Sequence, residues 1–141
     1  MIQRIQSVWL FLAALLGVLY TQVPIYILSV AGNTVKKFEP TESLLLFAVS
    51  IAVALLALGC IFLYKKRTLQ FKLAIIGFLA SIGIIALEVT QVSGYENTVP
   101  LSKGSYYWGS LLPIAMAVFF IMASSGIRKD EKLVKSLDRL R

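Results

Sequence analysis

Glu88 is the residue of this 141-residue chain whose type and position most directly suggest chemistry. It is the one acid within a long apolar run, residues 71–92, and an ionisable side chain inside an apolar helix is by default a candidate functional site. A carboxylate there could relay protons or bind a cation, with Gln91 as a polar neighbour. Glu88 also lies near the end of its run, where it could reach an interface and serve a structural role. Because the other apolar runs offer no polar partner at mid-depth, we favour the structural interpretation.

Composition excludes most other catalytic chemistry. The chain has no His, which removes His-based triads, His general bases and His-ligated metals. Its single Cys, Cys60, cannot form an internal disulfide or a thiolate cluster. Both Asp residues, Asp130 and Asp138, lie close to the C-terminus, so the paired acids of an intramembrane protease are missing. We therefore predict that the protein is not an enzyme and has no catalytic, cofactor-binding or metal-binding residues.

Four apolar runs make up most of the chain, and two of them contain Cys60 and Glu88. Hydrophobic residues make up 58% of the chain and charged residues 15%, against roughly 45–50% and about 25% in soluble domains. The runs cover about residues 5–23 (or 5–30, if the first crosses Pro24), 44–64, 71–92 and 108–127. Each has the ~20 residues that cross a bilayer core. We predict an all-α integral membrane protein, an antiparallel bundle of four transmembrane helices over residues 1–127, with the first run retained rather than cleaved as a signal peptide.

Basic residues fall mainly on one side of the predicted bundle. That side holds Arg4, Lys65, Lys66, Arg67, Lys72, Arg128, Lys129, Lys132, Lys135, Arg139 and Arg141, whereas the other side holds Lys36, Lys37 and Lys103. Because Lys and Arg accumulate in cytoplasmic loops, this distribution predicts that both termini are cytoplasmic. The formal net charge of +7 is therefore explained by topology, without nucleic-acid binding.

Residues 128–141 form a basic tail with a helical apolar pattern. Leu133, Val134, Leu137 and Leu140 fall on one stripe, with charged residues on the other faces. Such a cytoplasmic amphipathic helix could lie on anionic lipid headgroups, or it could dock its leucine stripe on a partner protein. It lacks aromatic platforms for base stacking, so no specific nucleic acid is expected.

Small residues recur at four-residue spacing within the runs. The pairs are Ala13 with Gly17, Ala48 with Ala52, and Gly77 with Ser81. This spacing allows helix backbones to approach closely in lipid. It supports a packed bundle and does not distinguish packing within the chain from packing on a partner.

Three segments carry a resemblance to a known family. They are MIQRIQS at residues 1–7, KKRTLQFKL at 65–73 and IRKDEKLVKSLDRLR at 127–141. Together with the length and the number of runs, they resemble the bacterial inner-membrane family catalogued as domain of unknown function 4293, found chiefly in Bacteroidetes. The resemblance implies four spans and an inner-membrane location, and it implies no activity.

These observations lead to two functional hypotheses. The first is a non-enzymatic accessory or scaffold subunit of a larger membrane protein complex, which contacts a partner or anionic lipid through its basic cytoplasmic face. Its candidate contact residues are Arg4, Lys65, Lys66, Arg67, Lys72, Arg128, Lys129, Lys132, Leu133, Lys135, Leu137, Arg139, Leu140 and Arg141. The alternative is a small homo-oligomeric transporter or channel that uses Glu88 and Gln91.

Overall fold

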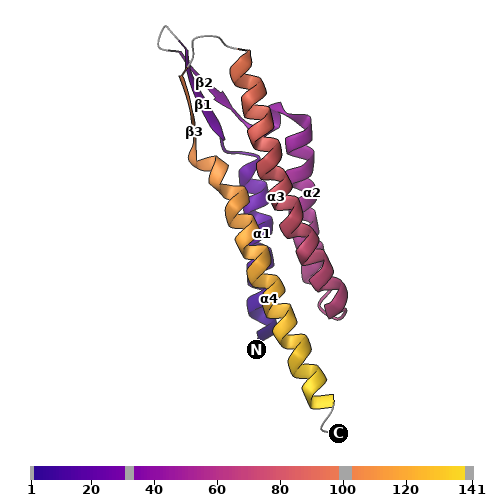
Figure 1. Cartoon of the computed structure of the whole chain (residues 1–141). Helices are drawn as coiled ribbons and strands as arrows, with labels where there is room; N and C mark the ends of the chain where they lie inside the picture. The colour runs from indigo at the N-terminus through magenta and orange to yellow at the C-terminus, as the bar shows by residue number, and fades with distance from the viewer. Residues whose placement is uncertain (1, 31–33, 99–102, 139–141) are drawn as a thin grey trace.

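The computed structural model describes residues 2–30, 34–98 and 103–138, and it consists of four helices with a small sheet at one end (Figure 1). In chain order the elements are α1 (Ile2–Tyr20), β1 (Tyr26–Val30), β2 (Thr34–Phe38), the 3-10 helix η1 (Pro40–Glu42), α2 (Leu44–Phe62), α3 (Arg67–Asn97), β3 (Lys103–Tyr106), the 3-10 helix η2 (Trp108–Leu111) and α4 (Leu112–Asp138). The predicted all-α class is confirmed for the bulk of the described chain, whereas the sheet was not predicted.

The four helices form a ring in which each packs against two others. Helix α1 contacts α2 and α4, and α3 contacts the same two helices from the other side. Consecutive helices run in opposite directions, so the N-terminus, the α2–α3 link and the end of α4 lie at the end of the bundle away from the sheet (Figure 1). This arrangement brings together segments that are distant in the sequence.

Within the described residues, three helical segments are long and apolar enough to cross a membrane. They are Leu44–Phe62, Arg67–Asn97 and Trp108–Val134, while the apolar part of α1, Ile5–Tyr20, is shorter. The second predicted run, 44–64, agrees closely with α2. Helix α3 extends beyond both ends of the predicted run 71–92. Helix α4 continues through residue 128 without interruption, so the basic tail is a continuation of the last helix.

The longer form of the first predicted run, residues 5–30, is wrong. Helix α1 ends at Tyr20, and a turn follows in which the Thr21 N–H donates to Val18 O at 3.2 Å. Pro24 cannot donate a helical hydrogen bond, and the chain resumes as strand β1. The apolar residues at 26–30 therefore belong to a strand, in which Tyr26 and Leu28 are buried, rather than to a span.

The sheet has the order β2-β1-β3, and both pairings are antiparallel. Tyr26 of β1 lies opposite Phe38 on β2 and opposite Tyr106 on β3. Tyr26 and Leu28 are buried, as expected for alternate residues on the inner face of a half-covered sheet. The sheet closes one end of the bundle and fixes the entry to α4.

Small residues allow close helix packing at two of the three predicted pairs. A Cβ at Gly17 would lie 2.9 Å from the Cβ of Ala54 on α2, and a Cβ at Gly77 would overlap the Phe120 ring of α4. Ala48 and Ala52 are exposed instead, on a face of α2 that packs against no other helix. Two of the predicted pairs therefore lie at close helix contacts, Gly17 between α1 and α2 and Gly77 between α3 and α4.

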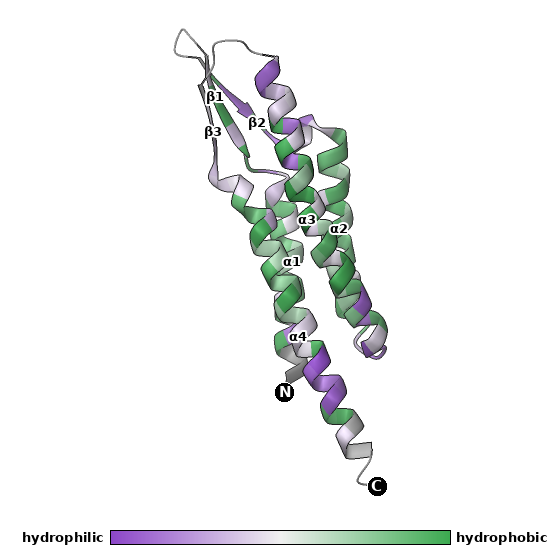
Figure 2. Cartoon of the chain, in the orientation of Figure 1, coloured by the Kyte–Doolittle hydropathy of each residue, from purple (hydrophilic) through white to green (hydrophobic). Residues whose placement is uncertain are grey.

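The outer surface of the helices is apolar. Leu55 is 62% exposed on α2, Leu79 is 59% exposed on α3, and Val118 is 47% exposed on α4. Figure 2 shows hydrophobic residues along most of the bundle, with hydrophilic residues at the α2–α3 link and in α4 beyond the bundle. Large apolar side chains are thus exposed along the middle of the helices, where a membrane protein meets lipid.

Candidate functional site at the basic end

The basic end is defined here as the first turns of α1, the α2–α3 link at residues 63–66, the first turns of α3, and α4 from Arg128 onward. Most of the predicted contact residues gather there (Figure 1). Exposed cations at this end are Lys65, Lys66, Lys72, Arg128, Lys129 and Lys132, and Arg67 is half-buried. Only the backbone of Arg4, Lys135 and Leu137 is described, and Arg139, Leu140 and Arg141 lie outside the described residues.

A buried hydrogen bond joins α1 to α4 at the basic end. The side-chain amide of Gln6 donates to Asp130 Oδ2 at 2.7 Å, and the two residues are 5% and 7% exposed. Gly126 allows this contact, because a Cβ there would lie 2.8 Å from Gln6 Cγ. A buried carboxylate requires such a donor, so this pair fixes the position of α4 where it leaves the bundle.

Helix α3 is joined to its neighbours at the same level. Arg67 Nη1 donates to the backbone oxygen of Asp130 at 3.4 Å, and the guanidinium of Arg128 lies 5.2 Å from the centroid of the Phe71 ring. The Gln70 amide donates to the carbonyl of Cys60 at 3.0 Å, and the same carbonyl near the end of α2 also accepts from the N–H of Leu63 at 3.3 Å. Polar side chains therefore connect all four helices at this end.

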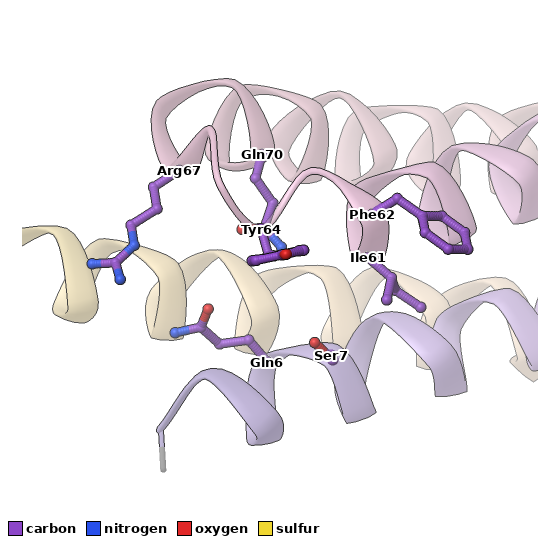
Figure 3. A pocket seen from close by; sticks show the side chains of 7 residues that line it. All are labelled: Gln6, Ser7, Ile61, Phe62, Tyr64, Arg67 and Gln70. Carbon is purple, nitrogen blue, oxygen red and sulfur yellow. The ribbon is translucent and has the colours of Figure 1, made fainter.

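A groove opens between α1 and the α2–α3 link, with a volume of about 440 Å³. We call it the link groove, and its lining residues are Gln6, Ser7, Ile61, Phe62, Tyr64, Arg67 and Gln70 (Figure 3). The side chains of Phe62 and Tyr64 are largely exposed at its edge. The groove therefore combines an apolar wall with polar groups and one cation. A second groove, of about 340 Å³, lies between α1 and α4 beside Trp9 and Lys129.

Helix α4 projects beyond the other helices at the basic end (Figure 1). In this projecting part Leu133 is 52% exposed and Val134 41% exposed, and Lys132 beside them is exposed. Two members of the predicted apolar stripe are thus uncovered by the rest of the described chain.

The opposite end of the bundle contains two Tyr–Glu pairs along α3. The Tyr20 hydroxyl donates to Glu88 Oε2 at 3.1 Å, and Glu88 is 3% exposed. Eight residues further along, Glu96 accepts a hydrogen bond from the Tyr26 hydroxyl of β1. Burial, together with that hydrogen bond, raises the pKa of Tyr26 to about 12. Gln91, predicted as a partner of Glu88, is half-buried on α3.

Metal chemistry has no visible site in the described part of the chain. Within residues 2–30, 34–98 and 103–138, no three His, Cys, Asp or Glu side chains lie close enough to hold an ion. Cys60 is fully buried as a free thiol. The buried acids Glu88 and Asp130 each accept a hydrogen bond from a side chain of α1.

Residues 2–140 match the family described as "Domain of unknown function (DUF4293)". The chain belongs to this family. The match extends from the first turn of α1 to residue 140 in the basic tail and confirms the predicted membership. No curated protein and no solved structure matches this DUF4293 member.

Sequence reasoning missed the partners of the buried acids in this DUF4293 chain. Tyr20 lies 68 positions before Glu88, and Gln6 lies 124 positions before Asp130. Each partner is a residue with a polar group close to an end of α1. A polar side chain at a helix end was the one feature of the sequence that could have indicated a partner for a buried acid. The pairing itself depends on which faces of the helices meet, which the apolar periodicity did not define.

Proposed function

We propose that this DUF4293 member is a non-enzymatic integral protein of the bacterial inner membrane and serves as an accessory or scaffold subunit of a larger membrane protein complex. In this proposal the four helices cross the bilayer as an antiparallel bundle, with both termini in the cytoplasm. The partner binds the basic end, above all the projecting part of α4. The observation that carries the proposal is the uninterrupted course of α4 into the basic tail, which exposes Leu133 and Val134 beyond the bundle.

The membrane placement is supported by the surface and length of the helices. Exposed side chains on α2 and α3 are large and apolar along the middle of the bundle. Three helices are long and apolar enough to cross a bilayer, whereas the apolar part of α1, Ile5–Tyr20, is shorter and spans about 24 Å at 1.5 Å per residue. The cations at the basic end support the proposed orientation, because Lys and Arg accumulate on the cytoplasmic side.

A protein partner is favoured over the bilayer surface as the occupant of the tail stripe. A helix that lies on a membrane must turn away from the axis of the span that precedes it. Helix α4 is continuous from Leu112 to Asp138, which favours a tail that leads away from the bilayer in the proposed placement. Leu133 and Val134 are then positioned to pack into a groove of a cytoplasmic or membrane partner, with adjacent cations facing acidic groups.

Purification of the tagged full-length chain in several mild detergents tests this proposal. The variant Leu133→Gln with Val134→Gln removes the stripe without changing charge, and Ser136→Gln on the same exposed helix is the matched control. We expect the wild type and the control to retain a partner at a fixed molar ratio and the double variant to lose it. Recovery of the wild type as a monodisperse monomer in every detergent would contradict the proposal.

Glu88 supports a second proposal, a small homo-oligomeric transporter or channel. Its carboxylate is buried in the C-terminal half of α3 and accepts a hydrogen bond from Tyr20 of α1. Buried acids in membrane helices often mark proton or ion paths. The hydrogen bond to Tyr20 equally explains Glu88 as a structural connection between α1 and α3. A flux measurement on a Glu88 variant separates these two roles.

A further inference from the structure

We propose that the link groove binds one anionic phospholipid, with its phosphate at Arg67 and one acyl chain along Ile61 and Phe62. The inference rests on the membrane placement in the proposed function, and it is independent of any partner protein. The groove is a side-chain cavity of about 440 Å³, within the range of small-ligand sites. It is also open at its edge, where Phe62 is 80% exposed.

The groove lies where the apolar part of the bundle meets its charged end. Phe62 is the last residue of α2, and Arg67 begins α3 after a four-residue link. Ile61 and Phe62 therefore line the groove on the side of the apolar bundle, and Arg67 lines it on the side of the charged end. A phospholipid has its apolar and charged parts in the same order, since its acyl chains lie in the bilayer core and its phosphate lies at the interface.

Arg67 is held in place for phosphate binding. Its Nη1 donates to the backbone oxygen of Asp130 at 3.4 Å, which restrains a side chain that is already half-buried. A guanidinium has five N–H donors in a planar fork, so other donors remain for the oxygens of a phosphate. Arginine matches phosphate geometry better than lysine, because two parallel N–H groups can bind two oxygens.

The charge around the groove favours an anionic headgroup over a zwitterionic one. Its seven lining residues, all within the described chain, include Arg67 and no acid. Lys65 and Lys66 are exposed on the adjoining link. Arg67 contacts Asp130 at its backbone oxygen. The Asp130 carboxylate is buried and accepts a hydrogen bond from Gln6. The groove is thus a cationic site with an apolar wall.

Lipid titration of the purified full-length chain tests the proposal. Phosphatidylglycerol or phosphatidylcholine is added to detergent micelles, and the upward shift of the thermal unfolding midpoint gives the apparent affinity. We expect phosphatidylglycerol to bind more tightly than phosphatidylcholine. The Arg67→Gln variant should weaken phosphatidylglycerol binding about five- to tenfold, in line with about 1 kcal/mol or more per interfacial cation. Phe62→Ala, at an exposed position that leaves the core intact, should weaken it as well.

Lys72→Gln is the matched control, because Lys72 is an exposed cation on the same helix outside the groove lining. It should change the affinity less than twofold. Equal affinities for the two lipids, or equal losses in Arg67→Gln and Lys72→Gln, would overturn the proposal. A full shift with glycerol phosphate alone would overturn it too, since that indicates a small-anion site. Flotation of the wild type with phosphatidylcholine vesicles reports membrane insertion separately, so failure of the lipid site is distinguishable from failure of the membrane placement.

Discussion

The amide of Gln6, in the first turns of α1, donates a 2.7 Å hydrogen bond to the carboxylate of Asp130, which lies 124 residues later in α4. Both side chains are almost completely buried. The pair therefore connects the first and last helices at the level where α4 leaves the bundle. Because both side chains are buried, loss of one leaves the other without the hydrogen bond that the pair supplies.

Replacement of Asp130 by Ala should lower the free energy of unfolding by about 1–3 kcal/mol, the cost of leaving a buried donor unsatisfied. Asp130→Asn retains an acceptor oxygen and should cost less. The measurement is unfolding in mixed detergent micelles, with Lys132→Ala as a control at an exposed position of the same helix. A double-mutant cycle with Gln6→Ala should give a coupling energy of the same order, whereas simple additivity of the two single variants would mean that the pair contributes nothing.

Gly77 and Gly83 provide a matched pair of substitutions on α3. A Cβ at Gly77 would overlap the Phe120 ring of α4, whereas a Cβ at Gly83 has nothing within 4 Å. Gly77→Ala should therefore destabilise the bundle by about 1–3 kcal/mol through overpacking. Gly83→Ala should be neutral or stabilising by up to about 1 kcal/mol, because Ala favours helix over Gly. Thermal unfolding of the two variants checks this, and equal midpoints would contradict the close α3–α4 packing.

The Tyr26–Glu96 pair predicts a loss of stability at high pH. Burial and the hydrogen bond to Glu96 raise the pKa of Tyr26 to about 12, from an ordinary value of 10. The folded state then binds the phenolic proton more tightly than the unfolded state does. The stabilisation is fully present below pH 10 and is lost as the pH rises towards 12.

Absorbance titration of tyrosinate measures this effect directly. The wild type should contain a late-titrating component to which Tyr26 contributes beside Tyr106, whose pKa is also raised by burial. Tyr26→Phe should reduce this component, and Glu96→Gln should shift part of it to lower pH. Glu42→Gln, which removes another exposed acid from the same end of the bundle, is the control and should leave the component in place. If Tyr26→Phe instead removed absorbance from the part of the curve that titrates near pH 10, the phenol would not be protected.

The sequence was sufficient to predict the helices but insufficient for the sheet. Residues 44–62 are apolar over a length that a strand does not reach, so a helix was the clear expectation. Residues 26–30 are equally apolar, and over five residues a strand cannot be told from the end of a span by periodicity. Pro24 was the informative signal, since it interrupts the run before the strand begins.

At the basic end, the sequence predicted where the cations would gather but did not predict which side chains would contact each other. Clustering of basic residues in segments at one side of four predicted spans correctly indicated that Lys65 and Arg128 would lie at the same end of the bundle. The burial of individual side chains there depends on how α4 is rotated about its own axis relative to the other helices. Asp130 belonged to a segment that looked solvent-exposed by composition, yet it is 7% exposed and bonded to Gln6. Such pairing is specified by tertiary packing, which a hydropathy pattern does not contain.

Glu88 gives the last prediction, because its two proposed roles differ in the response to one substitution. Glu88→Gln retains an oxygen that can accept from the Tyr20 hydroxyl, so the structural role predicts an unfolding midpoint close to that of the wild type. Tyr20→Phe removes the donor and should destabilise the chain, leaving a buried carboxylate unpaired. Proton flux into reconstituted vesicles, followed with an internal pH dye, then separates the roles. Flux in the wild type that Glu88→Gln abolishes at unchanged stability would establish transport, whereas no flux above empty vesicles in either protein would leave Glu88 as the connection between α1 and α3.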